Sequence, residues 1–262
     1  MAAHSCGRVA EWLRPAPPAP ADDFLTGSSG TVGGRRAAIR GLADRVLDVA
    51  WRRGPRGGDA RTVLVVGIER PGSLMPALLD ELRRSRHNVT VRVGPPGARG
   101  KFENLNALLA AEDLSAYDWL LVVDDDVEAP RGFLDRFLGA AERYGFALAQ
   151  PAHRLASHAA WPVTRRRPLS VARETAFARE TFDALLPFPD LRMGWGLDVH
   201  WAALARDRGW RIGVVDATPI RHTVKAAKAY DARPAIEEAR AFLATHPYLP
   251  RDEADRTLRT FR

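Results

Sequence analysis

Three consecutive aspartates, Asp124 to Asp126, are the residues of this sequence whose type and spacing point most directly to chemistry. They follow the apolar run Trp119 to Val123, which predicts a buried strand, and they precede a loop at Val127 to Pro130. Open α/β sheets bind ligands at the carboxyl ends of their strands, and a hard divalent cation relieves the repulsion between adjacent carboxylates. The triplet therefore predicts a cation site. A solvated turn with a helix-capping aspartate is the alternative.

A cation held there would neutralise the charge that builds on a diphosphate leaving group. The segment LVVDDDV, from Leu121 to Val127, resembles the DXD element of the GT-A glycosyltransferases. The resemblance implies a nucleotide-diphosphate sugar as donor and Mn²⁺ or Mg²⁺ as cofactor. It also implies that Asp126 ligates the metal directly. Asp124, the other residue of the metal site, would face the ribose or a metal-bound water. Asp125 is placed with the nucleotide-sugar contacts.

A second acidic position lies in the segment MGWGLD, which ends at Asp198. Leu197 and Trp201 recur at helical spacing, so the segment predicts the start of a helix. It resembles the acceptor-side acidic motif of family 2 glycosyltransferases. The resemblance implies that Asp198 is the general base for an unidentified acceptor, that the reaction inverts the anomeric carbon, and that Trp195 stacks on an acceptor sugar. A carboxylate that only benefits from the helix dipole, beside a core tryptophan, is the alternative.

The remaining candidate residues come from three other places in the chain. His222, in the segment PIRHT, resembles the late histidine that completes the metal site in several GT-A enzymes. Gly67 and Glu69 end the first expected strand, where this fold places contacts to base and ribose. Lys101 and Asn104 share one helical face and resemble the region that lines such nucleotide pockets. A core histidine and solvated polar side chains are the alternatives.

Strand and helix signals alternate along the chain, which is the pattern that builds a mostly parallel sheet with helices on its faces. Strands are expected at 62–68, 89–93, 119–123, 146–150 and 212–215. The predicted fold class is α/β, namely a GT-A (Rossmann-like) central sheet flanked by helices, in a single domain with a helical N-terminal extension. We expect a Pro/Gly-rich leader and amphipathic helix at 1–58, the catalytic domain at 59–232 and a helical tail at 233–262.

The amphipathic helix is expected over 36–53, where one apolar face with arginines around it is approximated by Ile39, Leu42, Val46, Val49 and Trp51. Packing of that face on the catalytic domain is the first expectation. The alternative is docking on an anionic membrane surface, where a lipid-linked acceptor would reside.

Net charge, cysteine count and hydropathy limit the cellular compartment that we expect for this protein, but they do not identify its ligand. A formal charge of +7 favours anionic partners of any kind, and the single cysteine, Cys6, excludes an intrachain disulfide in this sequence. Neither an apolar leader of signal-peptide length nor a run of about 20 apolar residues occurs. We therefore expect a cytoplasmic protein, with any peripheral membrane contact at the inner face. No nucleic-acid partner is predicted, and the sequence leaves the oligomeric state open.

The sequence departs from family 2 in two places. The second strand ends in Gly94-Pro95-Pro96 instead of the aspartate that often reads uracil, which leaves the identity of the base open. A Gln-x-x-Arg-Trp element is also missing.

Three other functions compete with a glycosyltransferase. A sugar nucleotidyltransferase would release pyrophosphate and needs a longer Gly-rich phosphate loop. A haloacid-dehalogenase-type phosphatase would not carry Glu128 in its motif. A non-enzymatic anion or nucleic-acid binder is supported by net charge and by Arg165 to Arg167, but it does not explain the acidic triplet.

Overall fold

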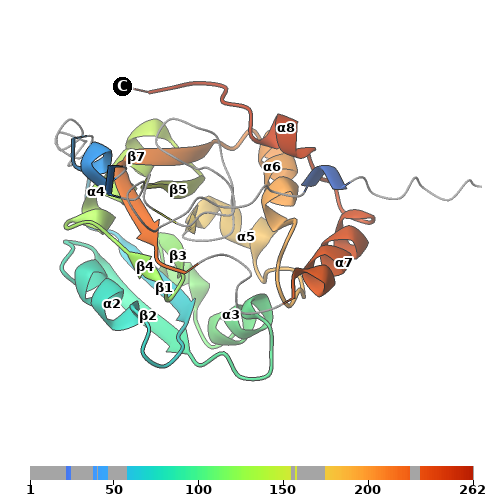
Figure 1. Cartoon of the computed structure of the whole chain (residues 1–262), viewed down its shortest axis with the longest axis horizontal. Helices are drawn as coiled ribbons and strands as arrows, with labels where there is room; N and C mark the ends of the chain where they lie inside the picture. Colours follow the sequence, from blue (N-terminus) through green and yellow to red (C-terminus); the bar gives the residue numbers. More distant parts are fainter. Residues whose placement is uncertain are drawn as a thin grey trace, which may run out of the picture.

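The computed structural model describes residues 22–24, 38–39, 41–46, 58–154, 157, 175–224 and 231–261. Within them, seven strands form one sheet in the order β2-β1-β3-β6-β5-β7-β4 (Figure 1). The strands are β1 (Thr62–Ile68), β2 (Asn88–Gly94), β3 (Trp119–Val123), β4 (Val127–Glu128), β5 (Leu148–His153), β6 (Thr175–Ala178) and β7 (Ile212–His222). β1 pairs in parallel with β2 and β3, and β5 pairs in parallel with β7. The predicted α/β class with a mostly parallel sheet is confirmed.

Helices cover both faces of this sheet. They are α2 (Met75–Arg83), α3 (Lys101–Leu109), α4 (Phe133–Tyr144), α5 (Phe182–Leu185), α6 (Leu197–Arg208), α7 (Ala232–Leu243) and α8 (Arg251–Ala254), with a short 3-10 turn, η1 (Asp22–Phe24), before them. α2 and α4 lie on one side of the sheet, and α3, α5, α6 and α7 lie on the other (Figure 1). A sheet sandwiched in this way must be apolar on both faces, which is why β3 is buried at every position.

The two faces have separate apolar cores. Leu121 of β3 packs with Leu78 of α2 and Phe137 of α4, whereas its neighbour Val122 belongs to the core with Phe102 of α3 and Trp201 of α6. Neighbouring residues of a strand point to opposite faces, so one buried strand supplies both cores. The carboxyl ends of β1, β3 and β7 consequently meet at one edge, where the acidic triplet begins.

The strand predictions were correct in place but not always in length. β7 runs to His222, seven residues beyond the expected end at 215, and carries a register shift opposite residues 151–153 of β5. The two-residue strand β4, which lies in the loop expected at Val127 to Pro130, was not predicted, and neither was β6. β6 is a four-residue strand that pairs antiparallel with both β3 and β5.

The C-terminal helices belong to the same packed body. Ala239, Phe242 and Leu243 of α7 join the core that contains Trp201 of α6. α8 follows and contacts α6 and η1. The boundary expected between 232 and 233 stays a prediction, although the helical nature of this region is confirmed.

The N-terminal helix differs from the first expectation. Residues 38–39 and 41–46 are helical, as predicted, but Ile39, Leu42 and Val46 are 70%, 64% and 64% exposed. Asp44 is buried instead. The prediction that the apolar face packs on the catalytic domain is therefore wrong for these three residues, because the helix buries Asp44 instead, and Val49 and Trp51 of that face lie outside the described residues. In the part of the chain that the structure describes, every helix is too short or too polar to cross a bilayer.

Candidate active site

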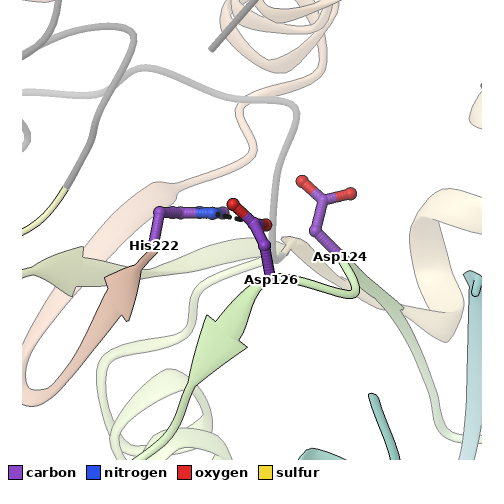
Figure 2. A group of neighbouring side chains, drawn as sticks. All are labelled: Asp124, Asp126 and His222. Atoms are coloured by element: carbon purple, nitrogen blue, oxygen red, sulfur yellow. Dashed lines mark hydrogen bonds and ion pairs between the residues drawn. The ribbon is translucent and has the colours of Figure 1, made fainter. Parts of the chain in front are cut away.

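Asp124, Asp126 and His222 come together at the carboxyl edge of the sheet. Each offers one ligand atom, and these atoms all lie within 4.8 Å of one another. Asp124 and Asp126 follow β3, and His222 is the last residue of β7 (Figure 2). The two strands are brought together by β4, because Val127 pairs with His222. The grouping of these three residues, predicted from motifs 96 positions apart, is present in the structure.

The His222 ring and the Asp126 carboxylate point toward each other, with 3.0 Å between Nδ1 and Oδ1 (Figure 2). Burial tends to raise the pKa of Asp126, but the hydrogen bond and charge of His222, together with the Val224 amide, outweigh burial and leave that pKa below its ordinary value. Asp126 is thus kept ionised. This hydrogen bond joins two atoms that could ligate a cation, so a cation held by both of them would replace it.

Asp124 forms an ion pair with Lys101. Its Oδ1 lies 2.6 Å from Nζ of Lys101 at the start of α3, and both side chains are about one-quarter exposed. The predicted contributors Asp124 and Lys101 are therefore neighbours. Asn104, one turn further along α3, is buried and donates through Nδ2 to the carbonyl oxygens of Pro96 and Arg99. Asn104 holds the β2–α3 loop, and its predicted nucleotide contact stays a prediction.

Asp125 is buried and forms an ion pair with Arg70, whose side chain is half-exposed. Its Oδ2 accepts from the backbone amide of Arg70 at 2.8 Å and from Nε at 2.9 Å, and its Oδ1 lies 2.5 Å from Nη2. The hydrogen bond that Arg70 donates to Asp125 raises the pKa of Arg70 above its ordinary value, despite partial burial. Asp125 thus fixes the loop after β1 next to the loop after β3. Its predicted contact with a nucleotide stays a prediction.

A hollow of about 320 Å³ opens beside that ion pair, between the ends of β1 and β2. It is lined by Glu69, Arg70, Pro71, Val93, Gly94 and Pro95. The amide of Glu69 donates to the carbonyl of Gly94 at 2.9 Å, which ties the two strand ends together. Gly67 lies deeper: a Cβ there would stand 2.9 Å from the Val123 carbonyl oxygen, so glycine permits β1 and β3 to approach. Of the two strand-end predictions, only Glu69 lines the hollow.

Asp198 lies in the first turn of α6, as predicted, but in a buried ion pair. Its Oδ2 is 2.5 Å from Nη2 of Arg251, and its Oδ1 accepts from the Val199 amide at 3.0 Å. Arg251 also reaches Asp255 at 3.4 Å and the Phe24 carbonyl at 3.0 Å. This side chain therefore joins α6, α8 and η1. The general-base role of Asp198 stays a prediction, and anchoring is the role that its contacts display.

The turn before α6 is fixed by a residue that the sequence did not single out. Glu238 of α7 accepts the backbone amides of Arg192, Met193 and Gly194. Gly194 has φ 71°, and a Cβ there would stand 2.0 Å from the Phe102 ring, so only glycine fits. Trp195 is half-buried and packs against the core at its edge. Its acceptor-stacking role stays a prediction.

Two further side chains of the site carried no sequence signal. His153 of β5 is buried, with its ring centroid 4.9 Å from that of His222, and therefore limits how the His222 ring can turn. Arg70 pairs with Asp125 across 55 positions. The sequence around His153 and around Arg70 contains no pattern that would predict these contacts with His222 and Asp125. Arg165 to Arg167, which the sequence analysis noted in support of an anion binder, lie outside the described residues.

No protein-family model and no curated protein sequence matches this chain. The fold is similar to that of a mannosyltransferase from Pyrobaculum calidifontis, solved in complex with GDP-Man and Mn²⁺, with a TM-score of 0.55 and 15% identity over 82% of this chain and 77% of that chain. The catalytic domain of Drosophila β1,4-galactosyltransferase 7, solved with xylobiose, overlaps more loosely, with a TM-score of 0.47 and 14% identity over 69% of this chain and 81% of that chain. At these identities the likeness concerns the fold, which is that of the GT-A nucleotide-sugar transferases.

Proposed function

We propose that this protein is a divalent-metal-dependent glycosyltransferase that moves a sugar from a nucleotide diphosphate to an acceptor. The observation that carries the proposal is the group formed by Asp124, Asp126 and His222 at the carboxyl edge of the sheet. The two aspartates follow β3, which pairs with β1. The end of β1 in turn lines a hollow that is suited in size to part of a nucleotide. The mannosyltransferase of similar fold was solved with GDP-Man and Mn²⁺, which supports the same ligand class here.

Two carboxylates and an imidazole form a donor set that fits Mn²⁺ or Mg²⁺. A metal bound there would supply positive charge to a departing diphosphate. Around it, the chain contributes fixed positions. Lys101 can exchange its partner Asp124 for a phosphate oxygen, because both side chains are partly exposed. Arg70 and Asp125 hold the loops after β1 and β3 at a constant spacing.

Asp198 remains our proposed general base, and inversion at the anomeric carbon follows from that role. To accept a proton, its Oδ2 has to exchange Arg251 for the acceptor hydroxyl. Trp195, three residues before it, is the proposed stacking surface for an acceptor sugar. Product analysis by NMR separates the cases: a retained anomeric configuration would remove Asp198 from this role without affecting the metal site.

Peripheral membrane contact is the proposed role of the exposed apolar stripe formed by Ile39, Leu42 and Val46. The exposed Arg45 beside it suits anionic headgroups. We expect the triple serine variant to lose co-sedimentation with phosphatidylglycerol vesicles, and Leu258→Ser, which removes another exposed leucine, to retain it. Equal sedimentation of all three proteins would refute this contact.

The central test is thermal melting and calorimetric titration with GDP and UDP, with and without Mn²⁺. A ligand at one hundred times its dissociation constant adds about 2.7 kcal/mol of stability. We expect Asp126→Ala to abolish Mn²⁺ binding and the Mn²⁺-dependent part of nucleotide binding. The matched control is Asp183→Ala, the same change at an exposed position of α5. Unchanged nucleotide and Mn²⁺ affinities in Asp126→Ala would overturn the proposal.

A further inference from the structure

The hollow between the ends of β1 and β2 holds one acidic side chain among apolar walls. Pro71, Val93 and Pro95 line it, and their ring and methyl groups offer surfaces for a flat aromatic ligand. Glu69 lies at the same rim and is half-buried. Among the described residues no hydrogen bond or ion pair is made by its carboxylate, although its backbone amide bonds to Gly94.

Arg70 completes the hollow with a planar group of fixed orientation. Two bonds from its guanidinium to Asp125, at 2.9 Å and 2.5 Å, hold the plane in place. The side chain is nevertheless 49% exposed, so part of the guanidinium remains open for stacking. Guanidinium planes stack well on aromatic rings, including nucleobases.

A carboxylate is an acceptor at both oxygens, and this restricts which base edge it can meet. Guanine presents two adjacent donors, N1–H and the 2-amino group, which match both oxygens. Uracil presents one N–H between two carbonyl oxygens, so it satisfies one carboxylate oxygen and leaves the other without a donor. Adenine and cytosine present an amino group next to an acceptor nitrogen. Of these four bases, guanine alone offers a pair of donors on one edge.

Resting on the proposed function, we infer that Glu69 is the residue that selects a guanine nucleotide as the sugar donor. Its carboxylate accepts from N1–H and the 2-amino group, while the base lies between the proline and valine walls and the Arg70 guanidinium. This assignment also accounts for Gly94-Pro95-Pro96 at the end of β2, since the wall opposite Glu69 has no side-chain group for a uracil to bond.

The test measures the affinities of GDP, inosine diphosphate and UDP for the full chain by calorimetry in Mn²⁺. Inosine lacks only the 2-amino group, so it isolates one of the two bonds. We expect GDP to bind about 10-fold more tightly than inosine diphosphate and 10- to 100-fold more tightly than UDP. In Glu69→Gln, GDP should bind about 10- to 100-fold more weakly, and the difference between GDP and inosine diphosphate should shrink.

Mn²⁺ affinity and melting temperature should be unchanged in Glu69→Gln, because Glu69 is not part of the metal group, meaning Asp124, Asp126 and His222. Glu180→Gln is the matched control, with the same chemical change at an exposed position that follows β6. Binding of UDP as tightly as GDP, or an unaltered preference for GDP in Glu69→Gln, would refute the guanine assignment and leave the transferase proposal intact. Failure of every nucleotide diphosphate to bind the native protein would remove both.

Discussion

Asp126 and Asp198 each stand where the sequence predicts a catalytic carboxylate, but the fold gives them different neighbours. Asp126 has a histidine, which can give up its proton and ligate a metal, and a second carboxylate nearby. Asp198 has an arginine, whose charge is permanent, and both side chains are below 10% exposed. The comparison shows that a motif locates a carboxylate in the chain, whereas its partner determines what the carboxylate is available for.

The two environments also differ in what they do for stability. Burying Arg251 costs free energy of desolvation. Removing it would also cost stability, because Asp198 and Asp255 would then be buried without a cation. Repulsion between carboxylates acts in both places: Asp198 raises the pKa of Asp255, and Asp124 raises the pKa of Asp126, although the net shift of Asp126 is downward. The Arg251 cluster thus joins three elements through one buried cation, whereas Asp124 and Asp126 each have a separate partner, Lys101 and His222.

The largest expected effect comes from breaking the Arg251 cluster. Arg251→Ala leaves Asp198 and Asp255 buried without their cation, and we expect it to lower the free energy of unfolding by about 3–5 kcal/mol. Urea denaturation measures this change. Arg206→Ala is the control, because its pair with Glu253 is more than half exposed and should cost less than about 1 kcal/mol. Equal losses in the two variants would contradict the distinction between the buried cluster and the surface pair.

The next effect is a pH dependence at Asp255. Burial raises the pKa of Asp255 from 3.8 to about 6, outweighing its pairing with Arg251. Between these two values the folded protein holds a proton that the unfolded chain has lost, so the free energy of unfolding falls as pH rises through this window. Asp255→Asn should remove this slope and be more stable than the native protein at pH 7.5, by at most about 3 kcal/mol.

Denaturation curves at pH 4, 5, 6 and 7.5 measure that slope in both proteins. Asp252→Asn, at an acidic position of α8 that is exposed, serves as the control and should keep it. A native protein whose stability rises steadily over this range, in parallel with Asp255→Asn, would show that Asp255 titrates as an ordinary surface carboxylate.

The metal group was predictable because its signals are local and the fold rule is general. A fully apolar run followed by Asp124 marks the end of a buried strand, and parallel strands end at one edge. His222 was placed with the triplet through the resemblance of its segment PIRHT to the late histidine of several GT-A enzymes, and the structure adds that β7, which ends at His222, is parallel to β5. The edge of the sheet therefore follows from pattern and chain order, without knowledge of any contact.

Other features depended on contacts that no local pattern records. β6 is four residues long and owes its conformation to pairing with β3 and β5, so its own sequence carries a weak strand signal. Arg251 lies 53 positions after Asp198, and the motif around Asp198 gives no indication of it. The exposed stripe at Ile39 had the right helical period, but period alone does not say which face of a helix meets the protein.

The smallest expected effect separates the two partners available to Asp124. Lys101 lies 2.6 Å from Asp124 and would compete there with a metal ion, yet it is also the lysine that we propose to meet a phosphate. Lys101→Met should therefore raise the Mn²⁺ affinity of the nucleotide-free protein while lowering the affinity for a nucleotide diphosphate about 10-fold, or about 1.4 kcal/mol. Lys101→Arg keeps the charge and should change both affinities less. Opposite signs are the decisive feature, because general damage to the site would lower both affinities together, and a lysine that only neutralises Asp124 would alter Mn²⁺ binding alone.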